Sequence, residues 1–342
     1  RTLNTRAGSF DPAPSIPMPA TVLILGANGR LGRSLVTAFH AAGWQVLAHA
    51  RRALEPPVPA GVQTLALPLS DLAGLAAVAS EAQIVVHAMN PPYTHWADQA
   101  LDLAHLAMNL AVRIGATLML PGNVYNYGSP MPAVLTETTP QRPSTRKGMI
   151  RAQIEAALQA RTALSSIVLR AGDFFGGAGH GAWFDAVITK RIRNGHIVYP
   201  GPLTVPHAWA YLPDLARVFV RVANRRAELE RYATLHFAGH AVTGETLVAA
   251  LTDSARRLAV LRERQMPKVS SLPWGLLRAG GLVLPMWREI AEMRYLWTEP
   301  HRLDDQALVR LIGAPDATPL PQAVDEALAE QLSHMASGPF TA

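Results

Sequence analysis

Short apolar runs alternate along the first half of the chain with segments whose apolar residues recur at helical spacing. Runs that are apolar on both faces are typical of buried parallel strands, and the intervening segments are typical of the helices that cover them. The pattern therefore predicts an α/β fold, a doubly wound parallel sheet of Rossmann-like type. The expected strands are residues 21–26, 44–50, 62–69, 83–89, 116–122 and 165–172, and the expected helices are 30–43, 71–80, 98–115 and 145–158.

Beyond Gly172 the alternation loosens, and the final hundred residues are mostly helical in pattern. We expect a dinucleotide-binding core over residues 20–171 and a smaller, mostly helical substrate lobe over 172–342. A helix near 212–224 and a strand near 234–238 should return from this lobe to the core. Residues 1–19 carry prolines without periodicity, and we interpret them as a disordered leader or an expression remnant.

The composition is that of a globular protein, with 49% hydrophobic and 16% charged residues in 342. The chain has no cysteine, which excludes disulfides, thiolate catalysis and cysteine-ligated metals and fits a reducing compartment, so we expect a cytoplasmic location. The histidines show no paired spacing, and we interpret His95, His105 and His180 as surface or packed residues. No metal site is expected.

The net charge of +6 comes almost entirely from arginine, without a long basic run. A nucleic-acid site would need clustered cations interleaved with aromatic residues, so we do not expect a nucleic-acid partner. No apolar run is long enough to span a membrane. The closest, residues 276–287, is interrupted by Arg278 and Pro285; a buried helix and turn is the preferred interpretation, and a peripheral membrane contact stays open.

Three glycines lie between the first strand and the first helix, in "LGANGRLG". Gly26, Gly29 and Gly32 would permit a tight turn and let a pyrophosphate approach the amino terminus of the helix. The strand before and the helix after supply the context that this motif requires. A simple strand-to-helix turn is the alternative.

The second strand ends in "HARR", where an acidic residue would bind the ribose hydroxyls of NAD. Arg51 and Arg52, with Arg30 inside the glycine loop, would instead attract a 2′-phosphate, so we expect NADP(H) rather than NAD(H). Asp71 begins the helix after the third strand. It could accept from the adenine amine, although capping of the helix is the safer interpretation.

At this point the chain resembles the extended short-chain dehydrogenase/reductases, the NAD(P)-dependent epimerase/dehydratase-like family. "ILGANGRLG" is similar to the nucleotide loop of that family, "VVHAMNPP" to its fourth-strand motif, "YNYGSP" to the loop after its fifth strand and "LRAGDFFGG" to its sixth-strand motif. "HAWAYLPDLARVFV" resembles a later segment of the family, with Asp214 at the usual acidic position. The resemblance and the glycine loop together imply cofactor contacts from Gly26, Asn28, Gly29, Arg30, Leu31, Gly32, Arg51, Arg52, Asp71, His87, Ala88, Met89, Lys147, Arg170 and Gly172.

The catalytic signature of that family is Tyr-x-x-x-Lys, preceded by a serine or threonine. Glu155 sets the register, in which Lys147 stands at the tyrosine position, Arg151 at the lysine position and Asn123 at the serine or threonine position. The chain thus departs from the signature at all three positions. Tyr125 and Tyr127, in the loop facing the same pocket, are rival proton donors.

Two interpretations of "TRKGMIRAQIEAAL" stay open. Either Arg151 holds cofactor ribose and its charge makes Lys147 a proton donor near neutrality, or Lys147, Arg151 and Glu155 form a solvated ladder of charges. The first implies an oxidoreductase or epimerase acting on a small carbonyl-type or apolar substrate, and the alternative is a non-catalytic NADP(H)-binding sensor or assembly subunit. A homodimer stays open. Aromatic residues could form an apolar substrate wall or could be core: Phe174, Phe175, Trp183, Phe184, Trp209 and Tyr211.

Overall fold

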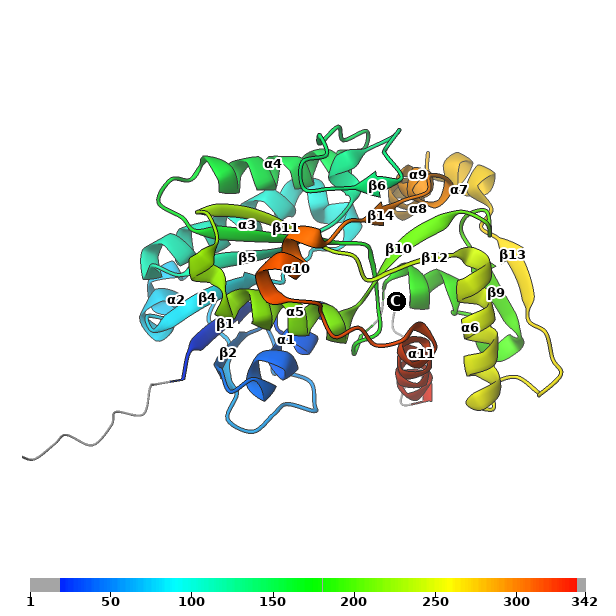
Figure 1. The fold of residues 1–342 in the computed structure, drawn as a ribbon, viewed down its shortest axis with the longest axis horizontal. Helices are drawn as coiled ribbons and strands as arrows, with labels where there is room; N and C mark the ends of the chain where they lie inside the picture. Colours follow the sequence, from blue (N-terminus) through cyan, green and yellow to red (C-terminus); the bar gives the residue numbers. More distant parts are fainter. Residues whose placement is uncertain (1–18, 180, 337–342) are drawn as a thin grey trace, which may run out of the picture.

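Within the residues that the structure describes, 19–179 and 181–336, seven parallel strands form one sheet in the order β11-β7-β5-β4-β1-β2-β3 (Figure 1). The structure is a computed structural model. The strands are β1 (Thr21–Leu25), β2 (Gln45–His49), β3 (Gln63–Leu65), β4 (Ala82–His87), β5 (Thr117–Gly122), β7 (Ser166–Ala171) and β11 (Tyr232–Phe237). The expected doubly wound sheet is confirmed, and each of its strands lies where the apolar runs predicted it.

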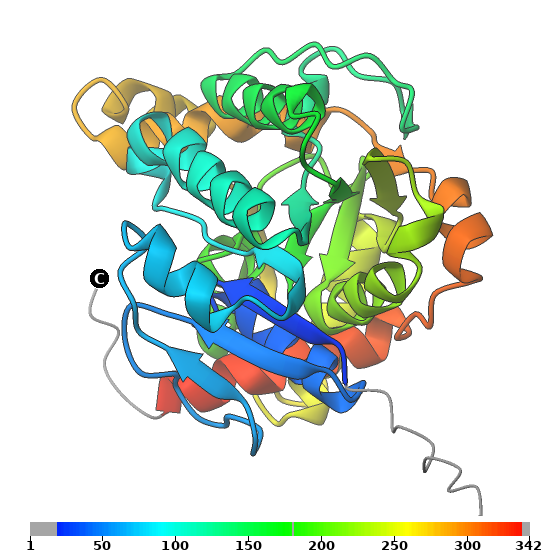
Figure 2. The same ribbon diagram turned by 90° about the vertical axis from the view of Figure 1, so that its left-hand side faces the viewer.

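Alternation of side chains along β1 explains why the sheet is covered on both faces. Val22 and Ile24 join one core cluster, while Leu23 and Leu25 join the other, and all four are fully buried. One layer packs on each side of the sheet, as Figure 2 shows. The first layer contains α1 (Arg30–Ala41), α5 (Leu212–Asn224) and α10 (Gln306–Ile312), and the second contains α2 (Leu72–Val78), α3 (Trp96–Ile114) and α4 (Arg146–Ala160).

The order in which strands are added to the sheet reverses between β1 and β4, which are parallel, hydrogen-bonded neighbours. β2 and β3 lie on one side of β1, and β4 and the later strands lie on the other. Ligands of such sheets bind in the crevice at this switch point, beyond the carboxyl ends of the strands. The segments at this edge are the loop after β1, the segment after β4 and the loop between β5 and α4. The last of these holds the short helical turn η2 (Tyr125–Tyr127).

The remaining strands form three small sheets outside the central one. They are β8 (Asp173–Phe175), β10 (Pro206–Tyr211) and β12 (His240–Thr243) in one sheet, β9 (His196–Tyr199) with β13 (Lys268–Ser271), and β6 (Val134–Leu135) with β14 (Arg302–Leu303). The further helices are α6 (Gly244–Arg257), α7 (Trp274–Gly280), α8 (Pro285–Ala291), α9 (Tyr295–Thr298) and α11 (Leu320–Ala336), with short turns η1 (Tyr93–His95), η3 (Phe184–Ile188), η4 (Ile192–Asn194), η5 (Arg226–Glu228) and η6 (Glu292–Arg294).

The helix and the strand expected near 212–224 and 234–238 are present as α5 and β11, and both pack into the core. The small sheets were not expected. Their strands are two to six residues long, too short to leave a clear period in the sequence. The interpretation of residues 1–19 as a leader or expression remnant falls, apart from Pro19, outside the described residues.

Candidate active site

The glycine loop after β1 folds tightly against its neighbours. Gly26 has a φ of +87°, and a Cβ added there would lie 2.9 Å from the backbone nitrogen of Met89. A Cβ at Gly32 would lie 2.2 Å from the carbonyl oxygen of Gly26. Both positions therefore require glycine, because the loop, the first turn of α1 and the segment after β4 approach one another too closely for a side chain.

The amino terminus of α1 is left open toward the crevice. Gly29 caps the helix without a side-chain hydrogen bond, and the first turn carries no acidic residue. The first N–H groups of α1, including those of Arg30 and Leu31, thus lack intrahelical acceptors and present the positive end of the helix. The residues present fit the pyrophosphate of a dinucleotide, as the glycine spacing predicted.

Asn28 connects this loop to the segment after β2. Its side-chain amide donates to the carbonyl of Ala53 at 2.9 Å, and its Oδ1 accepts from the backbone N–H of Glu55 at 3.1 Å. Arg51 and Arg52 lie in the segment held in this way, and both are exposed. Among the described residues, neither guanidinium has a hydrogen-bond or ion-pair partner.

Arg30 does not join these two arginines. Its guanidinium forms an ion pair with Asp185 and donates from Nε to the carbonyl of Gly176 at 2.9 Å. Asp185 is buried, so removal of Arg30 would leave a buried carboxylate without its partner. In this arrangement the side chain fastens the 176–185 segment to α1, which argues against the expected attraction of a phosphate by Arg30.

Asp71 caps α2, since its Oδ1 accepts from the backbone N–H of Gly74 at 2.9 Å. The capping interpretation is confirmed. His87 ends β4 and is buried, and its pKa is lowered to about 3 by burial and then by the charge of Arg151. It is therefore neutral at physiological pH. Ala88 and Met89 follow and pass directly beside Gly26.

Lys147 is 1% exposed and lies among carboxylates. Its Nζ forms an ion pair with Glu289, donates to the carbonyl of the same residue at 3.2 Å and reaches Glu292 Oε2 at 3.0 Å. The ammonium also lies 5.0 Å from the centre of the Tyr93 ring. Three partners account for all three ammonium donors. The side chain is therefore an anchor between α4 and the α8–η6 segment, and not a free acid at the crevice.

Arg151 lies one turn further along α4. Its guanidinium stacks over the Trp96 ring at 4.8 Å and donates from Nη1 to the carbonyl of Pro121 at 3.3 Å. Its Nε is buried without a partner among the described residues. Burial lowers the pKa of Arg151, and Tyr125, Glu155 and Tyr93 oppose that effect. The result is a half-buried fixed cation beside the end of β5.

Two phenols meet next to this cation. The hydroxyl groups of Tyr93 and Tyr125 are 3.2 Å apart, and Asn123 orients the second by accepting from its backbone N–H at 3.0 Å. Burial raises the pKa of both phenols, and the charge of Asp173 adds to this. Both groups are therefore protonated at neutral pH and can donate a hydrogen bond or a proton.

Tyr127 and Arg170 belong to a buried network instead. Arg170 pairs with Glu155 and donates from Nη1 to the Tyr127 hydroxyl at 2.6 Å, and that hydroxyl is 2.8 Å from His236 Nε2. The polar atoms of Arg170 and Tyr127 are engaged inside the core, which argues against the cofactor contact expected of Arg170 and the donor role expected of Tyr127. Burial lowers the pKa of Arg170, but the hydrogen bonds and charge of Glu155 more than reverse this.

The solvated ladder of Lys147, Arg151 and Glu155 is wrong as well. Glu155 is 2% exposed and pairs with Arg170 from β7, not with Arg151 one helical turn away. Gly172 meets a packing requirement rather than an evident ligand, since a Cβ there would lie 2.1 Å from the carbonyl oxygen of Ala208.

Sequence reasoning missed several side chains of this region. Tyr93 lies in the segment after β4, which was expected to line the crevice, but no spacing singled it out. Asp173 and His207 form a pair at 2.9 Å between β8 and β10, and His207 stacks on Trp297 with ring centres 4.2 Å apart. Glu289 and Glu292 gave no signal at all, because their partner lies more than 140 residues earlier.

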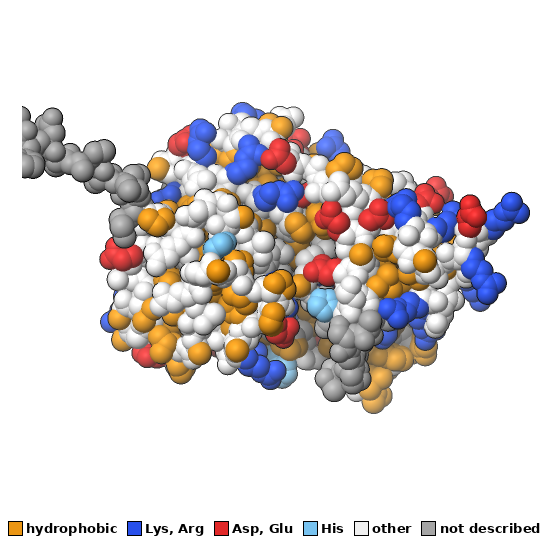
Figure 3. Space-filling view, turned by 90° about the horizontal axis from the view of Figure 1, so that it is seen from below, with side chains coloured by type: hydrophobic (Ala, Val, Ile, Leu, Met, Phe, Trp, Pro, Cys, Tyr) orange, Lys and Arg blue, Asp and Glu red, His pale blue; other side chains and the backbone are white. Residues whose placement is uncertain are grey.

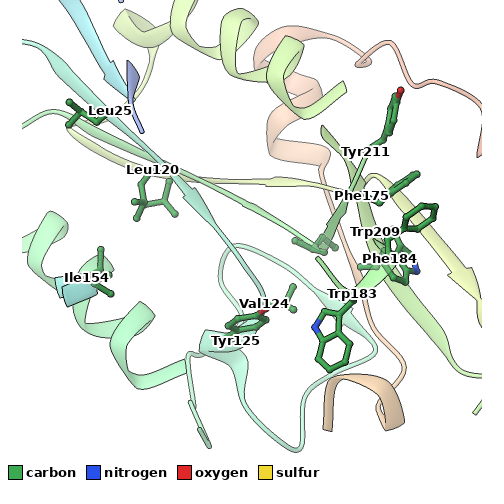
Figure 4. Close-up of a cluster of buried hydrophobic side chains, with 14 of the residues drawn as sticks. Leu25, Leu120, Val124, Tyr125, Ile154, Phe175, Trp183, Phe184, Trp209 and Tyr211 are labelled. Carbon is green, nitrogen blue, oxygen red and sulfur yellow. The ribbon is translucent and has the colours of Figure 1, made fainter. Parts of the chain in front are cut away.

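Five of the six aromatic residues proposed as a substrate wall are buried in the core, and Phe174 is partly buried against it. Trp183, Phe184 and Trp209 are 7%, 1% and 1% exposed. Phe175 packs against Phe184, Trp209 and Tyr211 at ring-centre distances of 5.4, 6.2 and 5.2 Å. Figure 4 shows this group on one side of the cluster, with Leu25, Leu120 and Ile154 on the other and Tyr125 between them.

Two cavities adjoin these elements. The larger, about 540 Å³, lies between the glycine loop, α1, the 54–58 segment, α5 and α11, with Asn28, Arg33, Tyr211 and Glu326 among its lining residues. The smaller, about 190 Å³, lies where α3, α4 and α8 meet, and is lined by Tyr93, Trp96, Arg146, Lys147, Arg288 and Glu289, among others.

Other chemistries gain no support from the described residues. They contain no cluster of three or more histidine, aspartate or glutamate side chains arranged to hold a metal. Nor do they contain a helix both long and apolar enough to cross a bilayer. The face seen in Figure 3 carries acidic, basic and apolar side chains interspersed, without a broad basic patch.

A doubly wound sheet with a glycine loop at its switch point defines a dinucleotide-binding fold of the extended short-chain dehydrogenase/reductase class. The sequence matches the model of the NAD dependent epimerase/dehydratase family over residues 22–235, and the chain belongs to this family. The resemblance stated from the motifs is thus confirmed.

Individual proteins are similar to the chain over different lengths. A dTDP-6-deoxy-L-talose 4-dehydrogenase (NAD(P)(+)) of Kitasatospora kifunensis is 31% identical over 170 residues, 46% of this chain and 54% of the relative. The chain thus spans about half the length of this curated relative.

Solved structures share the fold over nearly the whole chain. MoeE5 in complex with UDP-glucuronic acid and NAD has a TM-score of 0.70 at 19% identity, covering 92% of this chain and 100% of that one. UDP-glucose-4-epimerase from Stenotrophomonas maltophila has a TM-score of 0.72 at 14% identity, covering 93% and 100%. At these identities the likeness shows the fold alone.

Proposed function

We propose that this chain is an NADP(H)-dependent oxidoreductase or epimerase acting on a carbonyl or hydroxyl group of a small molecule, with Tyr125 as the proton donor. The observation that carries the proposal is the contact of the Tyr93 and Tyr125 hydroxyls, 3.2 Å apart, beside the half-buried cation of Arg151. These residues follow β4 and β5 or lie on α4, at the edge of the sheet where the family binds its nucleotide.

The bound cofactor would supply or accept a hydride. The chain would hold its pyrophosphate at the amino terminus of α1, through the glycine loop. Tyr125 would donate the proton that a reduced carbonyl oxygen requires, and Tyr93 would return a proton to it across the hydroxyl contact. Arg151 cannot exchange its proton near neutrality; it would hold polar groups of the cofactor or substrate and favour the charge left on the phenol.

Arg51 supports NADP(H) as the preferred form of the cofactor. It lies directly after the second strand, where the ribose next to the adenine would be bound, and its guanidinium is exposed without a partner among the described residues. This guanidinium would form a charge-assisted hydrogen bond with the 2′-phosphate of NADP(H). Arg52 would add to the local positive charge.

The similar proteins support a sugar-like substrate. The curated relative is by name a 4-dehydrogenase of a dTDP-linked deoxy sugar, and MoeE5 is in complex with UDP-glucuronic acid. We therefore propose a hydroxyl or carbonyl group on a sugar-like small molecule as the reacting group.

One observation favours a second candidate, a non-catalytic NADP(H)-binding sensor or assembly subunit. The side chain at the tyrosine position of the family signature, Lys147, is bound by two carboxylates. A protein that kept the nucleotide loop but had lost its acid would have an arrangement of this kind.

Turnover separates the two candidates. Calorimetry would first establish that the chain binds NADPH. Absorbance at the nicotinamide band would then follow NADPH oxidation, and NADP⁺ reduction, with a panel of carbonyls, enones, imines and sugar nucleotides. Turnover with any member supports the enzyme, binding without turnover across the panel supports the sensor, and failure to bind either nicotinamide dinucleotide overturns both.

A further inference from the structure

Exposed aliphatic side chains gather where α7 turns into α8. Leu282 is 90% exposed and Val283 81%, and they connect the two short helices. We define the hairpin tip as residues 276–288; its other exposed apolar side chains are Leu276, Leu284 and Met286. Figure 2 shows the two helices at the upper left edge of the molecule, in golden yellow. Apolar groups exposed together in this way usually mark a contact surface.

The charge around the hairpin tip has one sign. Residues 265–288 contain Lys268, Arg278 and Arg288 and no aspartate or glutamate. Arg278 and Arg288 lie within the tip and are exposed. The nearest acidic residue beyond it, Glu289, is buried and pairs with Lys147, and its second carboxylate oxygen lies 3.6 Å from Arg288 Nε. Arg278 has no ion-pair partner among the described residues. The tip therefore presents aliphatic groups flanked by cations.

We propose that the hairpin tip docks on the surface of a membrane that contains anionic phospholipids. Leu282 and Val283 would enter the boundary between headgroups and acyl chains, while Arg278 and Arg288 would bind lipid phosphates. This combination of buried apolar area and attraction to anionic headgroups is how amphipathic segments bind membranes without spanning them. The inference does not rest on the proposed enzymatic function.

The shape of the tip argues against the other occupants. A stable contact between proteins takes about 800 Å² from each partner, or roughly 20–30 residues a side. The tip offers five large apolar side chains that are exposed, on a short turn. In a twofold contact between two copies, the same patch would face itself and bring the arginines of one copy toward those of the other. A lipid surface, by contrast, supplies a negative charge and accepts a small convex wedge.

The hairpin is also fastened to the rest of the molecule. Glu289 follows the tip directly and pairs with Lys147, and the backbone N–H of Arg146 is bound by Glu292. The docked tip would therefore hold α4 and the 190 Å³ cavity beside it at a fixed orientation to the membrane, because Arg288 lines that cavity.

Flotation of the full chain with vesicles tests the proposal. Vesicles of phosphatidylcholine alone would be compared with vesicles of equal parts phosphatidylcholine and phosphatidylglycerol. We expect binding to the mixed vesicles that weakens as salt is raised. Leu282→Ser with Val283→Ser should weaken it by about tenfold or more, and Arg278→Gln with Arg288→Gln by about fivefold for each charge.

Matched controls come from exposed residues elsewhere. Val78→Ser with Val112→Ser removes two exposed aliphatic groups from α2 and α3, and Arg113→Gln with Arg310→Gln removes two exposed charges; neither pair should change binding. Thermal unfolding would confirm that every variant is folded. The proposal is overturned if the parent does not bind the mixed vesicles, or if the tip variants bind as the parent does. A change of oligomeric state in the tip variants, without vesicle binding by the parent, would assign the surface to a second copy instead.

Discussion

Lys147 and Glu289 form a buried ion pair that joins the start of α4 to α8, 142 residues later in the chain. The ammonium group of Lys147 also donates to Glu292 Oε2 at 3.0 Å and to the backbone carbonyl of Glu289 at 3.2 Å. Donation of a proton to a substrate would leave a neutral amine facing two carboxylates, which is unfavourable. The pair therefore favours a structural role for Lys147, the residue that the predicted register places at the tyrosine position of the signature.

Replacement of Lys147 by methionine should destabilise the fold strongly. The substitution leaves two carboxylates without their cation, and breaking a buried pair in this way costs about 3–5 kcal/mol. Equilibrium unfolding in urea would measure the loss. Lys190→Met, which removes an exposed lysine, is the matched control and should change little. A loss below about 1 kcal/mol for Lys147→Met, the range of surface pairs, would contradict a buried anchor.

The sequence predicted the sheet because its strands are long apolar runs bounded by turn residues, as "TVLIL" shows for Thr21–Leu25. It missed the small sheets because pairs such as β6 with β14 contain only two residues in each strand. β10 (Pro206–Tyr211), which pairs with β8 and β12, has no counterpart among the expected strands. Contacts between segments distant in sequence, rather than local pattern, determine these elements.

The parts of the site that depend on local backbone geometry could be predicted from the sequence. The parts that depend on contacts between distant segments could not. The three glycines placed the tight turn between β1 and α1 correctly, since their spacing reflects close backbone approach. Helical spacing suggested that Glu155 would neutralise Arg151, but Arg170 takes the carboxylate from β7. No local pattern could have indicated Glu289 as the partner of Lys147.

Stability should fall as the pH is lowered below neutrality, and His301 should be one cause. Burial, and then the charge of His207, lower its pKa from 6.5 to about 3. Its Nδ1 donates to the carbonyl of Glu299 at 3.0 Å, and its Nε2 has no partner among the described residues. Below pH 6.5 the unfolded chain takes up a proton that the folded chain does not, so the free energy of unfolding decreases as the pH falls toward 3.

Because the pKa of His301 is lowered, the free energy of unfolding should decrease by about 1.4 kcal/mol for each pH unit below 6.5. His301→Phe should therefore reduce the loss of stability between pH 6.5 and pH 4.5 by about 2 kcal/mol. Urea unfolding at both pH values would measure it, with exposed His95→Gln as the control. Parallel profiles for the parent and the phenylalanine variant would show that the imidazole is not held neutral.

NADPH should bind more tightly than NADH, and Arg51 should account for the difference. A charge-assisted hydrogen bond to a 2′-phosphate contributes about 1.5–3 kcal/mol, roughly tenfold or more in affinity. Calorimetry on Arg51→Ala should show the preference reduced by that factor, with NADH binding little changed. Arg30→Ala is the contrasting variant: its guanidinium holds Asp185, so any weakening should affect both cofactors alike. Equal affinities in the parent protein would refute the preference.

Tyr125→Phe should abolish most turnover while Tyr127→Phe should not. Both substitutions remove one phenolic oxygen from the same short turn, but only the Tyr125 hydroxyl contacts Tyr93 beside Arg151. Loss of a general acid typically lowers kcat by about 10²–10⁴-fold. Tyr127→Phe instead leaves Arg170 and His236 without their shared partner, so its effect should appear in the unfolding midpoint with kcat largely kept.

NADPH binding should survive both changes. Once a substrate is known, stopped-flow measurement of hydride transfer would decide: a parent-like rate in Tyr125→Phe, together with a large loss in folded Lys147→Met, would return the donor role to the lysine.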